Sequence, residues 1–162
     1  MDARAAELLE LLVACGGTLA TAESLTGGQL AARITSVPGA SLVYRGGVVS
    51  YATAVKVDLL GVPTTVVEKD GVISPACAEA MADGARRVVG ASYALSTTGV
   101  AGPDLQEGHP AGTVFVGVAS PEGVRTLPLR LDGDRPAVQA ATCEAALAAL
   151  ADVLRREHSG LG

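Results

Sequence analysis

Aromatic residues are nearly absent from this sequence, which has no Trp, one Phe and three Tyr among 162 residues. About half of the residues are nevertheless apolar, so the chain can bury a sizeable core of aliphatic side chains and alanine. Abundant alanine and glycine also suit helices that pack closely on a sheet. A chain of this length is typical of one domain, and we expect a single domain over residues 1–162.

Positive charge is also scarce. Twelve Lys and Arg residues are outnumbered by seventeen Asp and Glu residues, the net charge at pH 7 is −5, and the basic residues form no cluster. Proteins that bind DNA or RNA directly use a basic surface to neutralise the phosphates. We therefore expect no direct nucleic-acid binding, although the acidity gives no information about a substrate.

Typical metal ligands are few. The three cysteines are Cys15, Cys77 and Cys143, none of which belongs to a C-x-x-C pair, and the two histidines are His109 and His158. This composition makes a Cys/His zinc site unfavourable, and we expect no metal. The N-terminal region has no signal peptide and no long apolar span, so we expect a cytoplasmic protein without membrane association.

Helical and extended patterns alternate along the chain. The hydrophobic periodicity and the turn residues predict helices over 3–15, 29–35 and 52–60, a helical turn over 64–70, and helices that begin after Ser74 and after Asp134. Strands are predicted over 18–22, 48–51, 92–97, 112–119 and 124–131. The glycine pair Gly46-Gly47, just before one of these strands, indicates a bulge, or a place where a ligand or another backbone approaches closely.

This order predicts an α/β fold, a three-layer α/β/α sandwich. Its central sheet is expected to be mixed, because the last two strands read as an antiparallel hairpin, and Pro128 favours a sheet edge for the second of them. Ligands of such folds bind beyond the carboxyl ends of the parallel strands. Three unusual segments leave predicted strand ends, namely residues 23–28, 51–56 and 98–103. We expect them to meet at one rim.

The segment Thr21-Ala22-Glu23-Ser24-Leu25-Thr26-Gly27-Gly28 lies between a predicted strand and a predicted helix. A hydroxyl on such a turn can be a nucleophile, and the N–H groups at the helix start can hold a developing oxyanion. The alternative is that Ser24 or Thr26 caps the helix while the glycines relieve crowding. On this segment alone we favour the cap, because a cap needs only one such residue.

A serine nucleophile needs a base that accepts its proton. His109 lies in a polar loop and His158 in the C-terminal tail, so a Ser-His-Asp triad is not expected. The remaining candidates are Lys56, whose pKa would be lowered by apolar surroundings, and Tyr51 as a relay. By themselves, Lys56 could equally be a solvated helix residue and Tyr51 a residue at the edge of the core.

The segment Thr98-Gly99-Val100-Ala101-Gly102-Pro103 combines a hydroxyl with flexible backbone. It suits a nucleotide phosphate or ribose, although a plain turn after a strand would look the same. The chain has neither a G-x-G-x-x-G fingerprint nor a G-x-x-x-x-G-K-[ST] loop, which disfavours dinucleotide redox chemistry and ATP hydrolysis.

Several motifs in the right order make the chain resemble one family over about residues 8–154. They are 22–28 (Ala-Glu-Ser-Leu-Thr-Gly-Gly), 47–51 (Gly-Val-Val-Ser-Tyr) with Lys56, 60–62 (Leu-Gly-Val), 98–103, 112–114 (Gly-Thr-Val) and 133–135 (Gly-Asp-Arg). The family is the C-terminal domain of the competence/damage-inducible protein CinA, which includes stand-alone nicotinamide-nucleotide amidohydrolases. The resemblance implies that the chain deamidates nicotinamide mononucleotide to nicotinate mononucleotide and ammonia, in pyridine-nucleotide recycling.

The resemblance also implies roles for individual residues. Together with the segments 51–56 and 98–103, the resemblance favours Ser24 as the nucleophile, activated by Lys56 and Tyr51, and leaves Thr26 as the helix cap. The substrate would be held by two groups of residues, namely Glu23, Thr26, Gly27 and Gly28 in the first turn and Thr98 and Gly99 in the later one. No metal or organic cofactor is implied. The partner would be a small-molecule nucleotide, and the oligomer a homodimer.

The chain departs from the usual family pattern on the side where the substrate phosphate is expected. His109 stands where lysine is usual, Gln139 stands where a second arginine is common, and segment 104–111 lacks a common pair of glycines. Leu25 and Thr53 also differ from the usual cysteine and asparagine, but neither has an implied catalytic role. The alternative hypothesis is therefore a catalytically weak nucleotide- or partner-binding module of the same fold.

Overall fold

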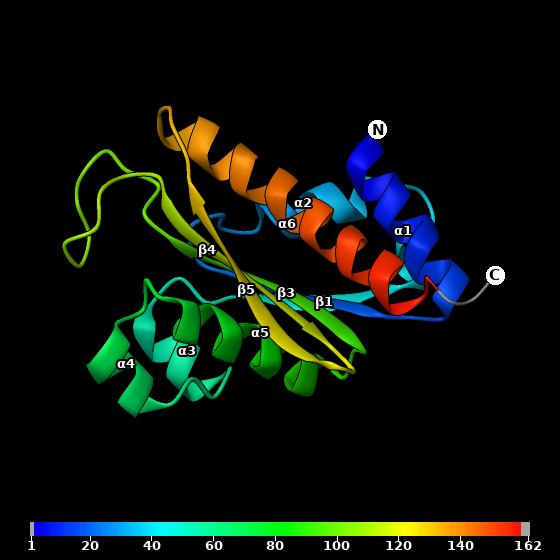
Figure 1. The fold of residues 1–162 in the computed structure, drawn as a ribbon, viewed down its shortest axis with the longest axis horizontal. Coiled ribbons are helices and arrows are strands. Elements are labelled where there is room, and N and C mark those ends of the chain that lie inside the picture. The colour runs from blue at the N-terminus through cyan, green and yellow to red at the C-terminus, as the bar shows by residue number, and fades with distance from the viewer. Residues whose placement is uncertain (1, 160–162) are drawn as a thin grey trace.

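A five-stranded sheet lies at the centre of the computed structural model, which describes residues 2–159 (Figure 1). Residues 1 and 160–162 of the expected domain lie outside the described range. In chain order the elements are α1 (Ala3–Cys15), β1 (Leu19–Glu23), α2 (Gln29–Thr35), the 3-10 helix η1 (Ala40–Leu42), β2 (Tyr44–Val49), α3 (Thr53–Asp58), α4 (Thr64–Asp70), α5 (Pro75–Val89), β3 (Tyr93–Gly99), β4 (Thr113–Ser120), β5 (Gly123–Arg130) and α6 (Arg135–Glu157).

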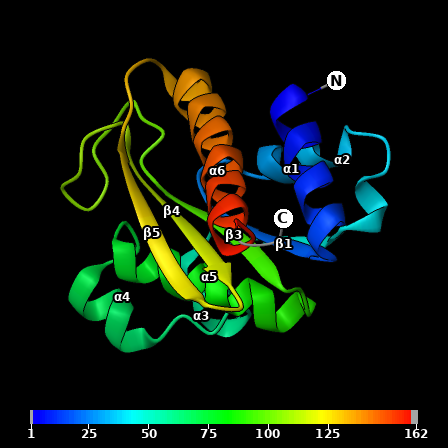
Figure 2. The same ribbon diagram turned by 45° about the vertical axis from the view of Figure 1, so that its right-hand side comes forward.

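The strand order is β2-β1-β3-β4-β5, and the sheet is mixed. Strand β1 pairs in parallel with both β2 and β3, whereas β4 is antiparallel to β3 and β5. Helices α1, α2 and α6 cover one face, and α3, α4 and α5 lie on the other (Figures 1 and 2). The predicted three-layer fold and its C-terminal hairpin are confirmed. Pro128 lies in β5, the edge strand, as expected for a residue without a backbone N–H.

Two apolar clusters fill the spaces between the layers. The cluster under α1 and α6 contains large aliphatic side chains such as Leu8, Leu12, Leu147 and Leu150, all fully buried. The cluster under α5 is built mainly from smaller residues, and α5 lies so close to the sheet that a Cβ added at Gly117 of β4 would lie 2.3 Å from the carbonyl oxygen of Ala78 in α5. The scarcity of aromatic residues is therefore matched by short distances between helix and sheet.

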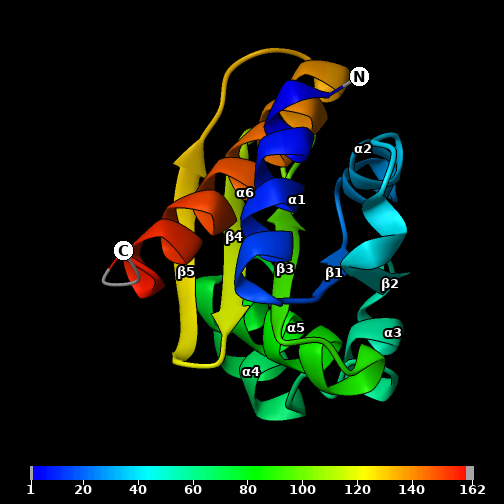
Figure 3. The same ribbon diagram turned by 90° about the vertical axis from the view of Figure 1, so that its right-hand side faces the viewer.

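Helix α6 is long and apolar enough to cross a membrane by length and composition, with a hydropathy of 1.4 over its most apolar window. Half of that window is buried in the fold. Figure 3 shows α6 lying across the sheet beside α1. Its packing on the sheet accounts for the apolar composition, as in the core helix of a globular domain.

The first strand boundary after α2 was predicted wrongly. Strand β2 covers Tyr44–Val49 rather than 48–51, so Gly46 and Gly47 lie inside it. Position 47 accommodates no side chain, because an added Cβ would lie 2.1 Å from Thr21 Oγ1 and 2.7 Å from the Tyr44 hydroxyl. The pairing of β1 with β2 also skips a residue between Tyr44 and Gly46. Both the expected bulge and the expected close approach are therefore confirmed.

Candidate active site

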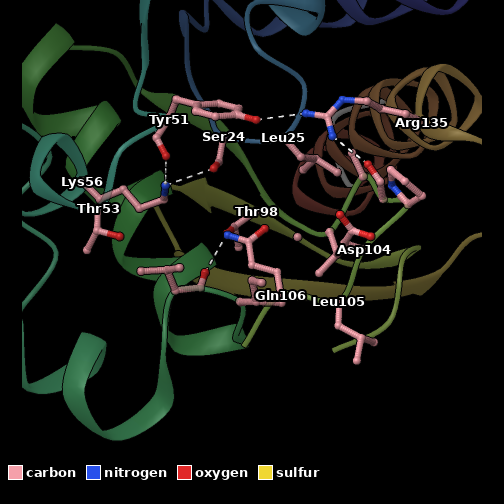
Figure 4. Close-up of a pocket in the computed structure, with 17 residues that line it drawn as sticks. Ser24, Leu25, Tyr51, Thr53, Lys56, Thr98, Asp104, Leu105, Gln106 and Arg135 are labelled. Carbon is pink, nitrogen blue, oxygen red and sulfur yellow. Dashed lines mark hydrogen bonds between the residues drawn. The ribbon is translucent and has the colours of Figure 1, made fainter. Parts of the chain in front are cut away.

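A cavity of about 380 Å³ opens at the carboxyl ends of β1, β2 and β3 (Figure 4). Since these strands are parallel, their ends lie along one rim, and all three segments expected there contribute to the lining. The lining residues are Ser24, Leu25, Tyr51, Thr53, Lys56, Val72, Ile73, Thr98, Gly99, Val100, Ala101, Gly102, Pro103, Asp104, Leu105, Gln106 and Arg135.

The central contact of this cavity joins Ser24 and Lys56. Lys56 Nζ lies 3.0 Å from Ser24 Oγ, 2.7 Å from the carbonyl oxygen of Ser50 and 3.1 Å from that of Tyr51. Although Lys56 is on the short helix α3, it is only 1% exposed. The solvated helix position considered for Lys56 is therefore wrong.

Burial lowers the pKa of the Lys56 amine, because a charged ammonium is poorly solvated there. Negative charge on Cys77 and Glu107 would act in the opposite direction on this pKa, and burial is the largest effect. A neutral amine has two N–H donors and one lone pair. The two carbonyl oxygens can therefore accept from the two N–H groups, and the Ser24 hydroxyl can donate to the lone pair.

The main chain holds the two strand ends in place. The Ser50 N–H donates to the Glu23 carbonyl oxygen at 2.8 Å, and the Ser24 N–H donates to the Thr97 carbonyl oxygen at 3.0 Å. Ser24 thus leaves β1 between β2, which supplies the carbonyls around Lys56, and β3. The pairing of the three strands brings the predicted nucleophile and base together.

Glu23 has a different environment from the one expected of a substrate contact. Its side chain is buried and accepts hydrogen bonds from the N–H groups of Leu30 and Ala31, at 2.8 and 3.1 Å, and from the Thr26 hydroxyl at 2.6 Å. These N–H groups are in the first turn of α2 and therefore have no hydrogen-bond partner within the helix. Glu23 caps α2 from the end of the preceding strand.

The prediction that Thr26 caps the helix is therefore wrong. The residue before α2 is Gly28, which makes no side-chain cap, and the Thr26 hydroxyl instead contacts Glu23 and, at 2.8 Å, Thr97. Gly27 and Gly28 have φ angles of +56° and +103°, which explains the glycine pair by the sharp turn. None of Glu23, Thr26, Gly27 and Gly28 lines the cavity, and their expected contact with a substrate stays a prediction.

Tyr51 lies at the mouth of the cavity, 60% exposed. Its hydroxyl accepts a hydrogen bond from Arg135 Nη2 at 3.0 Å, while its backbone carbonyl is the group that contacts Lys56. Arg135 also donates to the Gly102 carbonyl oxygen at 2.8 Å. Figure 4 shows the Tyr51 ring above Ser24 with its hydroxyl directed toward Arg135. The role of Tyr51 in activating Ser24 stays a prediction.

Sequence reasoning did not select Arg135 as a site residue. It is the first residue of an apolar helix and could equally be a solvated charge, so its position after Gly133-Asp134 in a family motif was the one indication of a functional role. The fold brings this guanidinium to the rim from α6, more than a hundred residues after Ser24 in the chain. No short stretch of the sequence therefore predicts that Arg135 lies at the same site as Ser24.

Thr98 and Gly99 line the cavity as expected. The Thr98 hydroxyl is buried and donates to the Val72 carbonyl oxygen at 2.6 Å, so it connects β3 to the segment before α5. Gly99 is required by space, because an added Cβ would lie 2.5 Å from the Thr113 carbonyl oxygen. Among the described residues that line the cavity, Lys56 and Arg135 are the basic ones and Asp104 is the acidic one.

The two substituted positions on the phosphate side lie outside this lining. Gln139 donates from its side-chain amide to the Leu25 carbonyl oxygen at 2.9 Å, and His109 forms a backbone bridge with Gln106 in the loop after β3. Within residues 2–159, no group of three or more His, Cys, Asp or Glu residues is close enough to hold a metal ion.

Comparison with known proteins agrees with the resemblance seen in the motifs. The family model of the CinA C-terminal domain matches residues 1–154. A CinA-like protein of Frankia casuarinae is 50% identical over 154 residues, which are 95% of this chain and 35% of that protein. The chain thus spans about a third of the length of the curated relatives it matches.

Solved structures are similar over nearly their whole length. A CinA superfamily protein from Klebsiella pneumoniae has a TM-score of 0.92 and 34% identity, covering 94% of this chain and 96% of that one. A CinA superfamily protein from Escherichia coli has a TM-score of 0.91 and 31% identity, covering 94% and 89%. The fold is thus an α/β domain of the CinA type, and the chain belongs to the CinA C-terminal domain family.

Proposed function

We propose that the chain is a nicotinamide-nucleotide amidohydrolase, which hydrolyses nicotinamide mononucleotide to nicotinate mononucleotide and ammonia in the cytoplasm. The observation that carries this proposal is the 3.0 Å contact between Ser24 Oγ and the buried Lys56 amine. A serine hydroxyl becomes nucleophilic only when a base accepts its proton, and a lysine of lowered pKa is such a base near neutral pH. The family, which includes amidohydrolases, supports the same chemistry.

In the first half of the reaction Lys56 Nζ takes the proton of Ser24 Oγ, and Oγ forms a bond to the carboxamide carbon. The carbonyl π electrons move to oxygen and give a tetrahedral oxyanion. When the oxyanion collapses, the C–N bond breaks, and the Lys56 ammonium gives its proton to the leaving nitrogen, which departs as ammonia. An ester between the nicotinate carbonyl and Ser24 remains, and Lys56 is neutral again.

The N–H of Leu25 is our candidate for stabilising the oxyanion. Leu25 follows Ser24 in the turn and lines the cavity, and within residues 2–159 its N–H donates to no protein oxygen. The N–H of Ser24 is already bonded to the Thr97 carbonyl oxygen. A backbone N–H directly after the nucleophile is a common oxyanion donor in enzymes that present serine between a strand and a helix.

In the second half a water molecule takes the place of the departed ammonia. Lys56 accepts a proton from this water as the water oxygen bonds to the ester carbon. Collapse of the second oxyanion breaks the C–Oγ bond, and Lys56 returns the proton to Ser24. The products are nicotinate mononucleotide and the original enzyme, so one water is consumed for each ammonia released.

The other end of the cavity suits the nucleotide part of the substrate. Arg135 presents a guanidinium at the mouth beside the Tyr51 hydroxyl, and guanidinium groups bind phosphate through paired N–H donors. The Tyr51 ring offers an aromatic surface at the same place. We propose that Arg135 contacts the phosphate while the carboxamide reaches Ser24.

The direct test incubates the purified chain with nicotinamide mononucleotide and measures ammonia and nicotinate mononucleotide together. The proposal predicts equal amounts of both products, formed in proportion to enzyme. Binding of the nucleotide without release of ammonia would instead favour a binding module. That alternative has one specific observation in its favour, since Gln139 is bonded to the Leu25 carbonyl where the family commonly has an arginine.

A further inference from the structure

The loop after β3, residues 104–111, is joined to the opposite side of the cavity by one side chain. Glu107 Oε2 accepts a hydrogen bond from the Val72 N–H at 3.2 Å, and Glu107 Oε1 accepts one from the Ile73 N–H at 3.0 Å. These N–H groups lie between the end of α4 and the start of α5. The carboxylate therefore gives partners to two N–H groups that no helix satisfies.

Both segments have a positive φ angle at this contact, one at Glu107 and the other at Gly71. Glu107 has a φ of +52°, and within residues 2–159 it is the only residue other than glycine with a positive φ. Such a conformation is costly for a side chain with a Cβ and persists where the surroundings enforce it. On the other side Gly71 has a φ of +79°, and a Cβ there would lie 2.8 Å from Glu107 Oε1.

The two joined segments form much of the cavity wall. Asp104, Leu105 and Gln106 line the cavity from the loop (Figure 4). Val72 and Ile73 line it from the other segment. The backbone hydrogen bonds of Gln106 and His109 stay inside the loop, because each residue bonds the other. The two hydrogen bonds accepted by the Glu107 carboxylate thus connect this part of the loop to the opposite wall of the cavity.

We propose that Glu107 is a positioning residue that fastens loop 104–111 to the Gly71–Ile73 turn, and thereby fixes the wall that selects the nucleotide part of the substrate. Glu107 does not line the cavity, whereas Ser24 and Lys56 do. Its loss should therefore weaken substrate binding more than the chemical step.

Hydrogen exchange tests the fastening without any substrate. In Glu107→Gln the two N–H groups lose a charged acceptor, so the amides of Val72 and Ile73 should exchange about tenfold faster, as expected for the loss of a charge-assisted hydrogen bond. The matched control is Glu122→Gln, an exposed carboxyl in the turn between β4 and β5. Unchanged exchange at Val72 and Ile73 in Glu107→Gln would overturn the proposal.

A pair of glycine variants tests the same contact from the other side. Gly71 and Gly90 have nearly equal φ angles, +79° and +77°, but a Cβ at Gly90 would meet no heavy atom within 4 Å. Only Gly71→Ala displaces Glu107. Because ψ is 175° at Gly71 and 50° at Gly90, Gly71→Ala also carries the greater local backbone strain, so exchange is compared at the Gln106 and His109 amides, on the loop side of the contact. Gly71→Ala should reproduce the exchange pattern of Glu107→Gln. The double variant Gly71→Ala/Glu107→Gln should exchange no faster than either single variant. If Gly71→Ala behaves like Gly90→Ala, the proposal fails.

Kinetics with nicotinamide mononucleotide tests the consequence for the substrate, and this arm rests on the proposed function. Glu107→Gln should raise KM about fivefold, the effect of one lost hydrogen bond, with kcat within about twofold of wild type. The comparison is made on the pH plateau, where Lys56 is neutral in both proteins, because the Glu107 charge also acts on the Lys56 pKa. A lower kcat at unchanged KM would overturn the positioning role. Inactive wild-type protein would refute the proposed function, whereas the exchange experiment would still decide whether Glu107 fastens the loop.

Discussion

At the residue scale, Lys56 is the group whose environment determines the chemistry. It is fully surrounded by protein, yet its amine contacts two carbonyl oxygens and one hydroxyl. Burial lowers the pKa of this amine from its usual value of 10.5. Only the neutral amine can accept the Ser24 proton, so the protonation state of one side chain controls the proposed reaction.

The pH dependence of the rate follows from that pKa. Below the lowered pKa of Lys56 the amine is protonated and inactive as a base, so kcat/KM should rise with pH and level off above it. The midpoint of this rise should lie below pH 10.5, the ordinary pKa of lysine, because burial lowers the Lys56 pKa. The check is a pH–rate profile, and a rate that is flat from acid to neutral pH would contradict this prediction.

Lys56→Met should lose about a thousandfold in kcat, a typical contribution of a general base.

Ser24 and Lys56 could be selected from the sequence because the alternatives were few. With no histidine near a strand end and two lysines in the chain, elimination left Lys56 as the base, with Tyr51 as a relay. Arg135 could not be selected in the same way, because a single charged residue in the first turn of a helix has no local signature. The cap of α2 was also missed, since a carboxylate that caps across a turn of several residues does not follow the usual pattern of capping residues.

At the element scale, the Glu23 carboxylate at the end of β1 joins this strand to the start of α2, and Ser24 lies in the turn between the two elements. The two N–H groups it accepts from are in the first turn of α2, and the side chain is buried with them. A buried N–H without an acceptor is destabilising. The turn that presents Ser24 therefore depends on a residue that does not line the cavity.

Glu23→Ala should lower the free energy of unfolding by about 2 kcal/mol, because it leaves the cap of α2 unmade. The control is Glu10→Ala, an exposed residue of α1, which should change the free energy by less than about 0.5 kcal/mol. Urea denaturation at neutral pH measures both. Equal stability of Glu23→Ala and wild type would show that the contact seen in the structure does not hold α2.

The elements themselves followed from the sequence with one clear exception. Helix α2 and helix α4 have the predicted boundaries, since apolar spacing and turn residues define both ends. Strand β2 begins four residues earlier than expected, because two glycines lowered its local strand preference. Their cost is offset by tertiary packing, in which Gly47 lies directly against Thr21 and Tyr44.

At the scale of the whole molecule, an ion-pair network joins the helices on one face of the sheet. Arg33 of α2 contacts Asp2, the cap of α1, and Glu144 of α6 at 2.7 Å. The hydrogen bond from Arg33 is the largest cause that lowers the pKa of Asp2 and of Glu144 below the ordinary carboxyl range. Three helices that are distant in the chain are thereby connected at the surface.

This network makes stability depend on pH in the acid range. Because both carboxyl pKa values are lower in the folded state, the stabilisation is present above the ordinary values of 3.8 and 4.5 and is lost as pH falls through the lowered ones. Arg33→Met should therefore flatten the acid limb of a plot of unfolding free energy against pH. Arg45→Met, at an exposed position of β2, is the control and should leave the slope unchanged.

The layers of the fold could be predicted because alternating helix and strand patterns have few solutions. The strand order could not, since the sequence period of a strand indicates which side chains are buried but not which strand pairs with which. The order matters for function, because it is the placement of β1 between β2 and β3 that brings Ser24, Lys56 and Thr98 to one cavity.

The proposed serine mechanism is tested most directly by the rate of ammonia release from nicotinamide mononucleotide in Ser24→Ala. The matched control is Ser41→Ala, an exposed serine of η1. Wild type and Ser41→Ala should release ammonia at the same rate, and Ser24→Ala, with its fold verified by circular dichroism, should release none above background. Full activity in Ser24→Ala would contradict the account, because the Ser24–Lys56 contact would then have no part in the reaction.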